Sequence, residues 1–385
     1  MRACPVCRYG GPITPLRHFA LSTPPGNPCT DGFDLISCTQ CGFSYADFPT
    51  SQSDIDRYYE ECSKYEFTPG PLAGCDQDRF KWIADFLKDK VPSNSRILDV
   101  GCACGGLLAA LGDAGFEKSN IKGLDPSATC VREVERMGFD AFNTTLFNLS
   151  ENMVGIQDVV ILSHVLEHVY DLHGALARVR SVLSPDGFLY IECPNAAEYH
   201  KVVHAPFQEF NTEHINHFNQ GAFDNLLLNS GFRHITAGNR IFKLPNGEDY
   251  HAVYGLYQKT DNVEFHQLKY DNVDLSSYLS QSDAIFSDME RVIRGIDPSV
   301  PLLLYGVGQL TFKLLASNAF TGKRIKYLVD DNPIYNSTNI QTFKKFNETY
   351  DGSELNVLIT SRIHQQQLHQ TLKDARISVR ALYVI

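Results

Sequence analysis

The sequence predicts an α/β protein of three domains, in which a small cysteine-rich domain precedes two α/β domains. Three observations support this fold class. Two Cys-x-x-Cys pairs lie within the first 41 residues, strands and helices alternate from Arg96 onward, and a second alternation begins at Pro301. Such alternation predicts mostly parallel sheets with helices on both faces. A length of 385 residues exceeds what one core usually serves, and we place the domains at residues 1–75, 76–260 and 261–385.

Composition and charge narrow the range of partners. Hydrophobic residues make up 43% and charged residues 21% of the chain, which is ordinary for a globular protein. With no apolar run of transmembrane length and no signal-type N-terminus, we expect a cytoplasmic protein without membrane contact. A net charge of −11 without a Lys/Arg cluster argues against nucleic acid and leaves a small-molecule substrate as the expected partner. The sequence does not predict the oligomeric state.

The segments Cys4-Pro-Val-Cys7 and Cys38-Thr-Gln-Cys41 predict a structural zinc (Zn2+) site. Each pair puts two thiolates on one tight turn, and two such turns supply a tetrahedral four-thiolate site. A closed site of this type leaves no position for a substrate, so its expected role is in folding. The alternative is four unpaired or redox-active cysteines, which the doubled spacing disfavours. Cys29 lies outside both pairs.

Hydrophobic patterning places the elements of the two α/β domains. In the central domain we expect helix 80–87, strand 96–100, helix 105–114, strand 121–124, helix 128–137, strand 159–162, helix 173–183, a turn at 184–187, strand 188–192, helix 221–230 and strands 232–241 and 251–257. In the C-terminal domain we expect helix 275–293, strand 301–305, helix 310–316, strands 325–329 and 357–360, helix 364–373 and strand 379–385.

A glycine turn after the first central strand predicts a nucleoside-type cofactor site. Ile97-Leu98-Asp99-Val100-Gly101 is a strand that runs into this turn, and a helix begins at Gly105-Gly106. Small residues at a helix N-terminus let backbone N–H groups approach a polar ligand closely. The second strand ends in Gly123-Leu124-Asp125, whose carboxylate can accept bonds from both ribose hydroxyls. Together the two strand ends indicate an adenosine-containing cofactor.

These residues resemble the motifs of class I S-adenosylmethionine (SAM)-dependent methyltransferases, which have a Rossmann-like fold. Leu98-Asp99-Val100-Gly101 is similar to their first motif, Asp125-Pro126 to the second, Asp158-Val-Val-Ile161 to the fourth-strand motif, and Leu166-Glu167-His168-Val169 to the stretch after it. One departure is Ala103, where the family usually has glycine. The resemblance implies SAM as the cofactor, bound by Asp99, Gly101, Cys102, Gly105, Asp125, Pro126, Ser163 and His164.

Two rival patterns fit less well. A NAD-type dehydrogenase needs Gly-x-Gly-x-x-Gly, and the glycines at 101, 105 and 106 do not have that spacing. His164-Val-Leu-Glu167-His168 matches the His-x-x-Glu-His pattern of zinc hydrolases. This segment begins directly after a strand, and no third ligand is evident, so we disfavour a hydrolase.

The densest cluster of polar and aromatic residues is 210–218, which contains Glu213, His214 and His217. It follows the strand that ends at Glu192, where a substrate would lie beside a methyl donor. A His with a neighbouring Glu can act as a general base near neutral pH. Glu213, His214 and His217 are therefore candidate catalytic residues.

The whole layout resembles the zinc-containing sugar C-methyltransferases, of the type found in mycarose biosynthesis, which combine a four-Cys zinc domain, a SAM domain and a Rossmann-like C-terminal domain. The resemblance implies C-methylation of a nucleotide-linked ketosugar, with His214 as the base beside Glu213. It also implies an aromatic residue near the cofactor, which is Tyr65 here. Where the family member has Tyr, this chain has Asn211, so the sugar and the methylated atom stay open.

The C-terminal domain opens with a strand-turn-helix at 302–310 that imitates a dinucleotide fold. Gly306 and Gly308 lack a third glycine, because Thr311 stands in its place. The resemblance implies a degenerate Rossmann-like domain that helps to hold the nucleotide end of the substrate, with Asp330 in a structural role. Two alternatives remain for the whole chain: an O-methyltransferase of a sugar or other hydroxyl, and a non-enzymatic zinc-ribbon interaction protein with a vestigial SAM fold.

Overall fold

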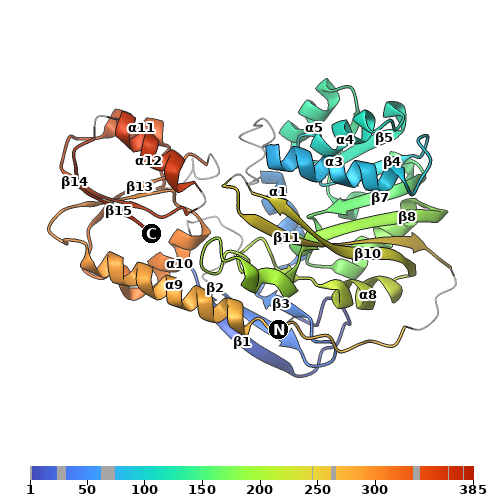
Figure 1. Cartoon of the computed structure of the whole chain (residues 1–385), viewed down its shortest axis with the longest axis horizontal. Helices are drawn as coiled ribbons and strands as arrows, with labels where there is room; N and C mark the ends of the chain where they lie inside the picture. Colours follow the sequence, from blue (N-terminus) through green and yellow to red (C-terminus); the bar gives the residue numbers. More distant parts are fainter. Residues whose placement is uncertain are drawn as a thin grey trace. The chain divides into compact units, whose positions relative to one another are not determined.

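The computed structural model describes residues 2–23, 32–61, 74–244, 246–261, 266–332, 339–362, 364–375 and 377–385 (Figure 1). The chain forms two compact units, each assembled from separate stretches. The first consists of Met1–Leu16, Leu35–Glu198 and Glu213–Val273, and the second consists of Arg17–Asp34, Tyr199–Thr212 and Asp274–Ile385. Both cysteine pairs therefore belong to the same unit as the predicted cofactor loop.

A seven-stranded sheet forms the centre of the first unit, in the order β10-β11-β8-β7-β4-β5-β6. Its strands are β4 (Ile97–Val100), β5 (Ile121–Asp125), β6 (Asp140–Asn143), β7 (Gln157–Ser163), β8 (Leu183–Pro194), β10 (Phe232–Lys243) and β11 (Asp249–Lys259). The five strands from β6 to β8 are parallel, and β11 is antiparallel to β8 and β10. The chain reverses its direction across the sheet between β4 and β7, which is where such sheets bind ligands. The predicted Rossmann-like α/β fold is confirmed.

Helices cover both faces of this sheet because successive strand residues point to opposite sides. The helices are α3 (Gly74–Lys88), α4 (Gly106–Asp113), α5 (Ala128–Arg136), α6 (Glu151–Val154), α7 (Leu172–Val182) and α8 (Gln220–Leu228). Ile97 and Val159 pack in one cluster with residues of α3, α4 and α5. Leu98 and Val160 pack in another with residues of α7 and α8. This second cluster also contains the buried cysteines Cys4, Cys38 and Cys41, so the cysteine-rich segment shares a core with the sheet.

One predicted turn is absent. Residues 184–187 were expected to separate a helix from a strand, but α7 ends at Val182 and β8 begins at Leu183. The pairing with β7 is irregular there, since the partners of Gln157 and Val159 are Leu183 and Phe188. The turn-forming residues are therefore accommodated as a bulge within the strand.

A second sheet, in the order β1-β2-β3-β9, joins the cysteine-rich segment to a distant part of the chain. Its strands are β1 (Ile13–Ala20), β2 (Gly32–Cys38), β3 (Ser44–Asp47) and β9 (Asn216–His217), and helix α1 (Gln52–Glu61) follows β3. Tyr45 pairs with Asn216 in antiparallel register, and the N–H of Ala46 donates to the carbonyl of Ile215 at 2.9 Å. The segment that carries the cysteines is thus bonded to the residues directly after His214.

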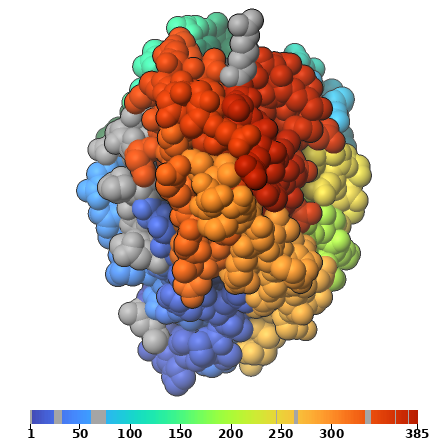
Figure 2. Space-filling view, turned by 90° about the vertical axis from the view of Figure 1, so that its left-hand side faces the viewer, coloured from blue at the N-terminus to red at the C-terminus, as the bar shows by residue number. Residues whose placement is uncertain are grey.

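The second unit is built on a four-stranded parallel sheet, in the order β13-β12-β14-β15. Its elements are α9 (Ser276–Gly295), β12 (Leu302–Tyr305), α10 (Gln309–Ala316), β13 (Ile325–Val329), α11 (Phe343–Thr349), β14 (Leu355–Ile359), α12 (Gln365–Asp374) and β15 (Val379–Val384). Figure 2 shows the surface of these elements in orange to red. The predicted second alternation of strands and helices is confirmed, and α11 is an addition to it. In the described part of the chain, no helix is long and apolar enough to span a membrane.

Lys313 is a buried cation within the second unit. It lies on α10 with 5% of its surface exposed, and its Nζ donates to the carbonyl of Phe207 at 2.9 Å. Burial lowers the pKa of Lys313 to about 7, and Glu209 opposes the shift while Arg17 adds to it. The Lys313 side chain thereby fastens residues 199–212 to the C-terminal α/β elements.

Replacing Lys313 with Met should change how the stability of the second unit depends on pH. Between a folded pKa of about 7 and the ordinary value of 10.5, the unfolded chain binds a proton that the folded chain does not. The free energy of unfolding of the wild type therefore rises with pH across this window, and below it the contribution is constant. We expect Lys313→Met to lose this rise in urea denaturation series, whereas Lys344→Met at an exposed position should keep it. Equal pH slopes in wild type and Lys313→Met would contradict the assignment.

Candidate active site

The glycine turn after β4 has a backbone that few residues adopt readily. Gly101 and Gly105 have φ values of 74° and 81°, and Gly105 is the N-cap of α4. Ala103, the departure from the methyltransferase pattern, also has a positive φ, of 44°. A non-glycine residue in this region costs about 1 kcal/mol, which explains the family's preference for glycine. The N–H of Ala103 donates to Asp125 Oδ2 at 2.9 Å, and this bond holds the strained residue in place.

Asp125 ties the ends of β4 and β5 together. Besides the bond from Ala103 to Oδ2, its Oδ1 accepts the N–H of Ser127 at 2.8 Å. Next to it, the N–H of Gly101 donates to the carbonyl of Leu124 at 2.7 Å. The structure therefore brings the predicted cofactor residues Gly101 and Asp125 together. A carboxylate has about four lone-pair sites, so it can still accept bonds from ribose hydroxyls.

Asp99 lies at the base of the loop and is 4% exposed. Burial raises the pKa of Asp99 to about 8, with Arg79 opposing the shift and Asp125 adding to it. The Nε of Arg79, on α3, is buried and has no hydrogen-bond partner among the described residues. A guanidinium here suits the carboxylate end of an amino-acid-like cofactor. Sequence reasoning missed Arg79, because a single Arg on an amphipathic helix gives no motif.

Cys102 and Pro126 directly follow Gly101 and Asp125 in the sequence. Cys102 is 4% exposed, and burial raises the pKa of its thiol. A Cβ on Gly123 would lie 2.7 Å from Cys102 Sγ, so a larger residue at position 123 would force the Cys102 side chain to move. The amide of Asn143 donates to the carbonyl of Pro126 at 2.7 Å. The Cys102 side chain thus packs against β5, and its backbone is the part that belongs to the turn.

The end of β7 leads into a buried network of ionisable groups. His164, with φ 56°, places Nδ1 3.1 Å from Glu167 Oε1 and Nε2 3.4 Å from Glu192 Oε1. Ser163 Oγ lies 3.5 Å from the same Glu192 oxygen. Burial works against the charged form, but hydrogen bonds to the two carboxylates raise the pKa of His164. The imidazolium form of His164 is therefore favoured between them.

Glu192 is the centre of this network and was missed by sequence reasoning as a site residue. Its Oε2 accepts hydrogen bonds from Arg240 at 3.0 Å and from the hydroxyl of Tyr190 at 2.9 Å. The guanidinium of Arg240 lies 4.2 Å from the centre of the Trp82 ring. Burial opposes ionisation, but His164 and Arg240 together lower the pKa of Glu192 to about 2. The residues that bond Glu192 lie on β8, on β10 and at the end of β7, which are far apart in the sequence. No local sequence pattern therefore predicts this network.

Glu213 and His214 lie against α1 and the segment after β7. The hydroxyl of Tyr58 donates to Glu213 Oε1 at 2.7 Å. His168 Nδ1 lies 2.9 Å from the carbonyl of Glu213 and 2.9 Å from the hydroxyl of Tyr59. The rings of His168 and His214 meet edge to face, with centroids 5.0 Å apart. The structure thus brings Glu213 and His214 to the end of β7, beside two tyrosines that the sequence did not single out.

The other candidate catalytic residues have different surroundings. His217 lies in β9 and is 1% exposed, and burial, with His214 adding to it, lowers its pKa to about 3. His217 is therefore neutral near pH 7. Asn211 is buried, and its amide donates to the carbonyl of Gln208 at 2.9 Å. Tyr65 lies outside the described residues.

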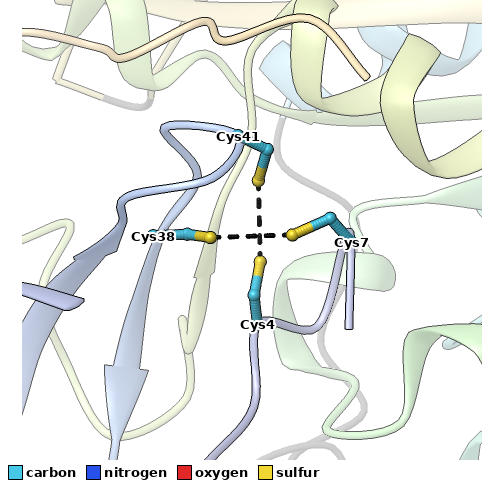
Figure 3. A group of neighbouring side chains, drawn as sticks. All are labelled: Cys4, Cys7, Cys38 and Cys41. Atoms are coloured by element: carbon cyan, nitrogen blue, oxygen red, sulfur yellow. Dashed lines mark hydrogen bonds between the residues drawn. The ribbon is translucent and has the colours of Figure 1, made fainter. Parts of the chain in front are cut away.

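The four cysteines of the two pairs form a compact group suited to a metal ion. Figure 3 shows the sulfurs of Cys4, Cys7, Cys38 and Cys41 pointing to a common centre. The Sγ atoms of Cys4 and Cys41 are 3.6 Å apart, as are those of Cys7 and Cys38. Tetrahedral zinc with bonds of about 2.3 Å separates its sulfurs by roughly 3.8 Å. The group therefore fits a zinc ion closely.

Glu167, His168 and His214 form a second group, whose ligand atoms lie within 4.8 Å of one another, so it too could hold a divalent cation. His164 is not part of it. The hydrolase pattern His-x-x-Glu-His requires both His residues on one face of an α-helix. The segment instead contains a single 3-10 turn, Leu166–His168, preceded by His164 in the left-handed region. This geometry disfavours the hydrolase alternative.

Comparison with known proteins agrees with the fold and the loop. Residues 75–237 match a family described as a methyltransferase domain. The mitochondrial ubiquinone biosynthesis O-methyltransferase of Bos taurus is 28% identical over 170 residues, which cover 40% of this chain and 44% of that protein. The Homo sapiens protein of the same name is 26% identical over 192 residues, covering 46% of this chain and 50% of that protein. The chain thus matches about half the length of these relatives.

Two solved methyltransferase structures align with parts of this chain at low similarity. The magnesium protoporphyrin IX methyltransferase of Synechocystis PCC 6803, with bound SAH, gives a TM-score of 0.42 at 15% identity, over 55% of this chain and all (100%) of that chain. The 1,6-didemethyltoxoflavin-N1-methyltransferase of Burkholderia thailandensis, also with SAH, gives 0.38 at 15% identity, over 58% of this chain and 97% of that one.

The family match, residues 75–237, contains strands β4 to β8 of the seven-stranded sheet and the glycine turn after β4. The chain therefore contains a methyltransferase domain, which supports the predicted enzyme class of SAM-dependent methyltransferases. The alternative of a non-enzymatic interaction protein is correspondingly disfavoured.

Replacing Asp125 with Asn should weaken SAM binding. The change removes the charge that ribose hydroxyls would bond, and an amide nitrogen would face a backbone N–H. Loss of a charge-assisted hydrogen bond of about 1.5–3 kcal/mol corresponds to roughly a 10- to 150-fold increase in Kd. Titration calorimetry with SAM measures this change in Kd. Asp140→Asn, at an exposed position on β6, is the control and should bind SAM like the wild type. Unchanged affinity in a folded Asp125→Asn protein would remove this residue from the site.

Proposed function

We propose that this protein transfers a methyl group from SAM to carbon in a nucleotide-linked ketosugar, with His214 as the general base. The observation that carries the proposal is the position of Glu213 and His214, anchored by Tyr58 and His168 at the end of β7. That edge of the sheet is also where the SAM-type loop lies, so an acceptor bound there meets the methyl donor.

The chemistry requires removal of a proton from the carbon next to the ketone. His214 removes it, and the enolate carbon then attacks the methyl group. Burial lowers the pKa of the adjacent His168, with His214 adding to the shift and Glu167 opposing it, which disfavours charge on both rings at once. Glu213, fixed by Tyr58, accepts hydrogen bonds from sugar hydroxyls.

The first-unit residues around the glycine turn hold SAM. Asp125 accepts the ribose hydroxyls, the N–H groups near Gly101 and Gly105 face the polar part of the cofactor, and Arg79 pairs with its carboxylate. SAM, when bound, supplies an electrophilic methyl group on a sulfonium, so no metal ion is needed at the reacting carbon. The acceptor is a small molecule.

The four cysteines hold a structural zinc ion. The site is closed, and its distance pattern supports tetrahedral thiolate coordination. Because β3, which follows Cys41, pairs with β9, zinc binding also orders the chain next to His214. The zinc acts on catalysis through this sheet and takes no part in the reaction.

O-methyl transfer is the second candidate. The curated relatives are named O-methyltransferases, and His214 could equally deprotonate a hydroxyl. The two reactions differ in the product, since a C-methyl group appears on a carbon skeleton and an O-methyl group as an ether. NMR of the product formed with isotope-labelled SAM distinguishes them.

Replacing His214 with Gln should abolish most turnover while leaving SAM binding intact. Loss of a general base typically costs about 100- to 10,000-fold in rate. The assay is transfer of labelled methyl from SAM to a panel of nucleotide-ketosugars, together with exchange of the substrate's acidic C–H for deuterium. His234→Gln, at an exposed position of β10, is the matched control and should behave as wild type. Wild-type turnover or exchange in the His214 variant would exclude His214 as the base.

Metal analysis should find about one zinc per chain. Cys38→Ser should lose the metal and lower the melting temperature, because the thiolate site and the β3–β9 pairing share the same sheet. Cys29→Ser, outside both pairs, should keep the zinc. A folded wild-type protein without zinc would contradict the metal assignment.

A further inference from the structure

We propose that Cys104 and Cys130 are a reversible disulfide site through which two-electron oxidants weaken SAM binding. The inference rests on the proposed binding of SAM at the glycine turn. Cys104 lies in that turn, between Ala103 and Gly105, and Cys130 lies in the first turn of α5.

The two thiols face each other closely. Their Sγ atoms are 3.6 Å apart, and a disulfide requires about 2.05 Å, so the sulfurs must approach by roughly 1.6 Å. Cys130 is fully buried, at 0% exposure, while Cys104 is half-buried. An oxidant therefore meets Cys104 first, and Cys130 is positioned to resolve the product.

The pair has the reactivity that such a site needs. The hydrogen bond from the Cys130 thiol stabilises the Cys104 thiolate and lowers the pKa of Cys104. The same contact raises the pKa of Cys130, so the proton stays on that sulfur. Cys102 and Cys193 are buried thiols whose pKa burial raises, which makes them poor nucleophiles.

The oxidation by hydrogen peroxide balances in two steps. The Cys104 thiolate attacks one peroxide oxygen, the O–O bond breaks, and a sulfenic acid forms with release of water after proton transfer. Cys130 sulfur then attacks the sulfenic sulfur, the S–O bond breaks, and a second water leaves. Two thiols lose two electrons in total, and one peroxide gains them.

The cross-link would act on the cofactor loop because both of its ends adjoin the groups that hold Asp125. Ala103, directly before Cys104, donates to Asp125 Oδ2, and Ser127 donates to Asp125 Oδ1. The N–H of Cys130 in turn donates to Ser127 Oγ at 3.1 Å. Ala103 and Gly105 are both fixed in the left-handed region, so the loop has little slack to absorb a closing movement. A closing movement would displace the backbone N–H groups of the glycine turn from the positions in which they can bond the cofactor. We therefore expect SAM affinity to fall at least about tenfold.

The test uses the zinc-loaded full chain. Reduced protein is treated with hydrogen peroxide, the remaining thiols are blocked by alkylation, and peptides are analysed by mass spectrometry. We expect a peptide pair linked through Cys104 and Cys130, which is lost in Cys130→Ser and retained in Cys29→Ser. Zinc is measured in every sample, so that loss of metal is not mistaken for loop closure.

Calorimetry with SAM completes the experiment. Oxidised wild type should bind SAM more weakly and dithiothreitol should restore binding, whereas Cys104→Ser, which lacks the thiol that peroxide attacks, should show the same affinity before and after peroxide. Since binding and cross-linking are coupled, prior saturation with SAM should slow formation of the linked peptide. Absence of the linked peptide, or equal SAM affinity with the link formed, would overturn the proposal. Reduced protein that binds no SAM would overturn the proposed function, and the peptide analysis would still decide whether the pair oxidises.

Discussion

The site depends first on one buried carboxylate. Asp125 accepts backbone N–H groups from Ala103 and Ser127, and in this way it locks the turn after β4 to the end of β5. The bond from Ala103 offsets part of the strain of an alanine in the left-handed region. The same carboxylate is the expected partner of the ribose. The Asp125 side chain therefore both shapes the loop and contributes to ligand recognition. As a result, the stability of the turn and the affinity for the cofactor are coupled.

The N-terminal segment imposes a second constraint on the site, because it pairs with the chain next to His214. The cysteine-rich segment lies about 170 residues before His214, yet β3 pairs with β9 immediately beyond that histidine. Helix α1, which follows the same segment, supplies Tyr58 to Glu213 and Tyr59 to His168. An N-terminal element with no expected role in chemistry is thus the scaffold of the proposed base. His164 is held in a similar way by buried residues, because Glu192 contacts its Nε2 and is itself paired with Arg240.

Local patterns made much of this predictable. Strand β4, the glycine turn and Asp125 are close in sequence and have fixed spacing, and the two cysteine pairs each occupy four residues. What could not be predicted depends on long-range contacts. Glu192 and Arg240 are 48 residues apart, and Tyr58 and Glu213 are 155 apart, so their pairing follows from the topology alone. The turn expected at 184–187 was wrong because turn-forming residues can also be absorbed in a bulged strand.

The division of the chain has a consequence for how such proteins can be rearranged. The second unit takes residues 17–34 and 199–212 from earlier parts of the chain, in addition to everything after residue 273. It is therefore not a cassette that could be cut off or exchanged at a single junction. Recombination within this architecture has to carry three stretches together, and the stretch that ends at Thr212 runs straight into Glu213 and His214. An exchange of the whole second unit therefore also replaces the segment that leads into the proposed base.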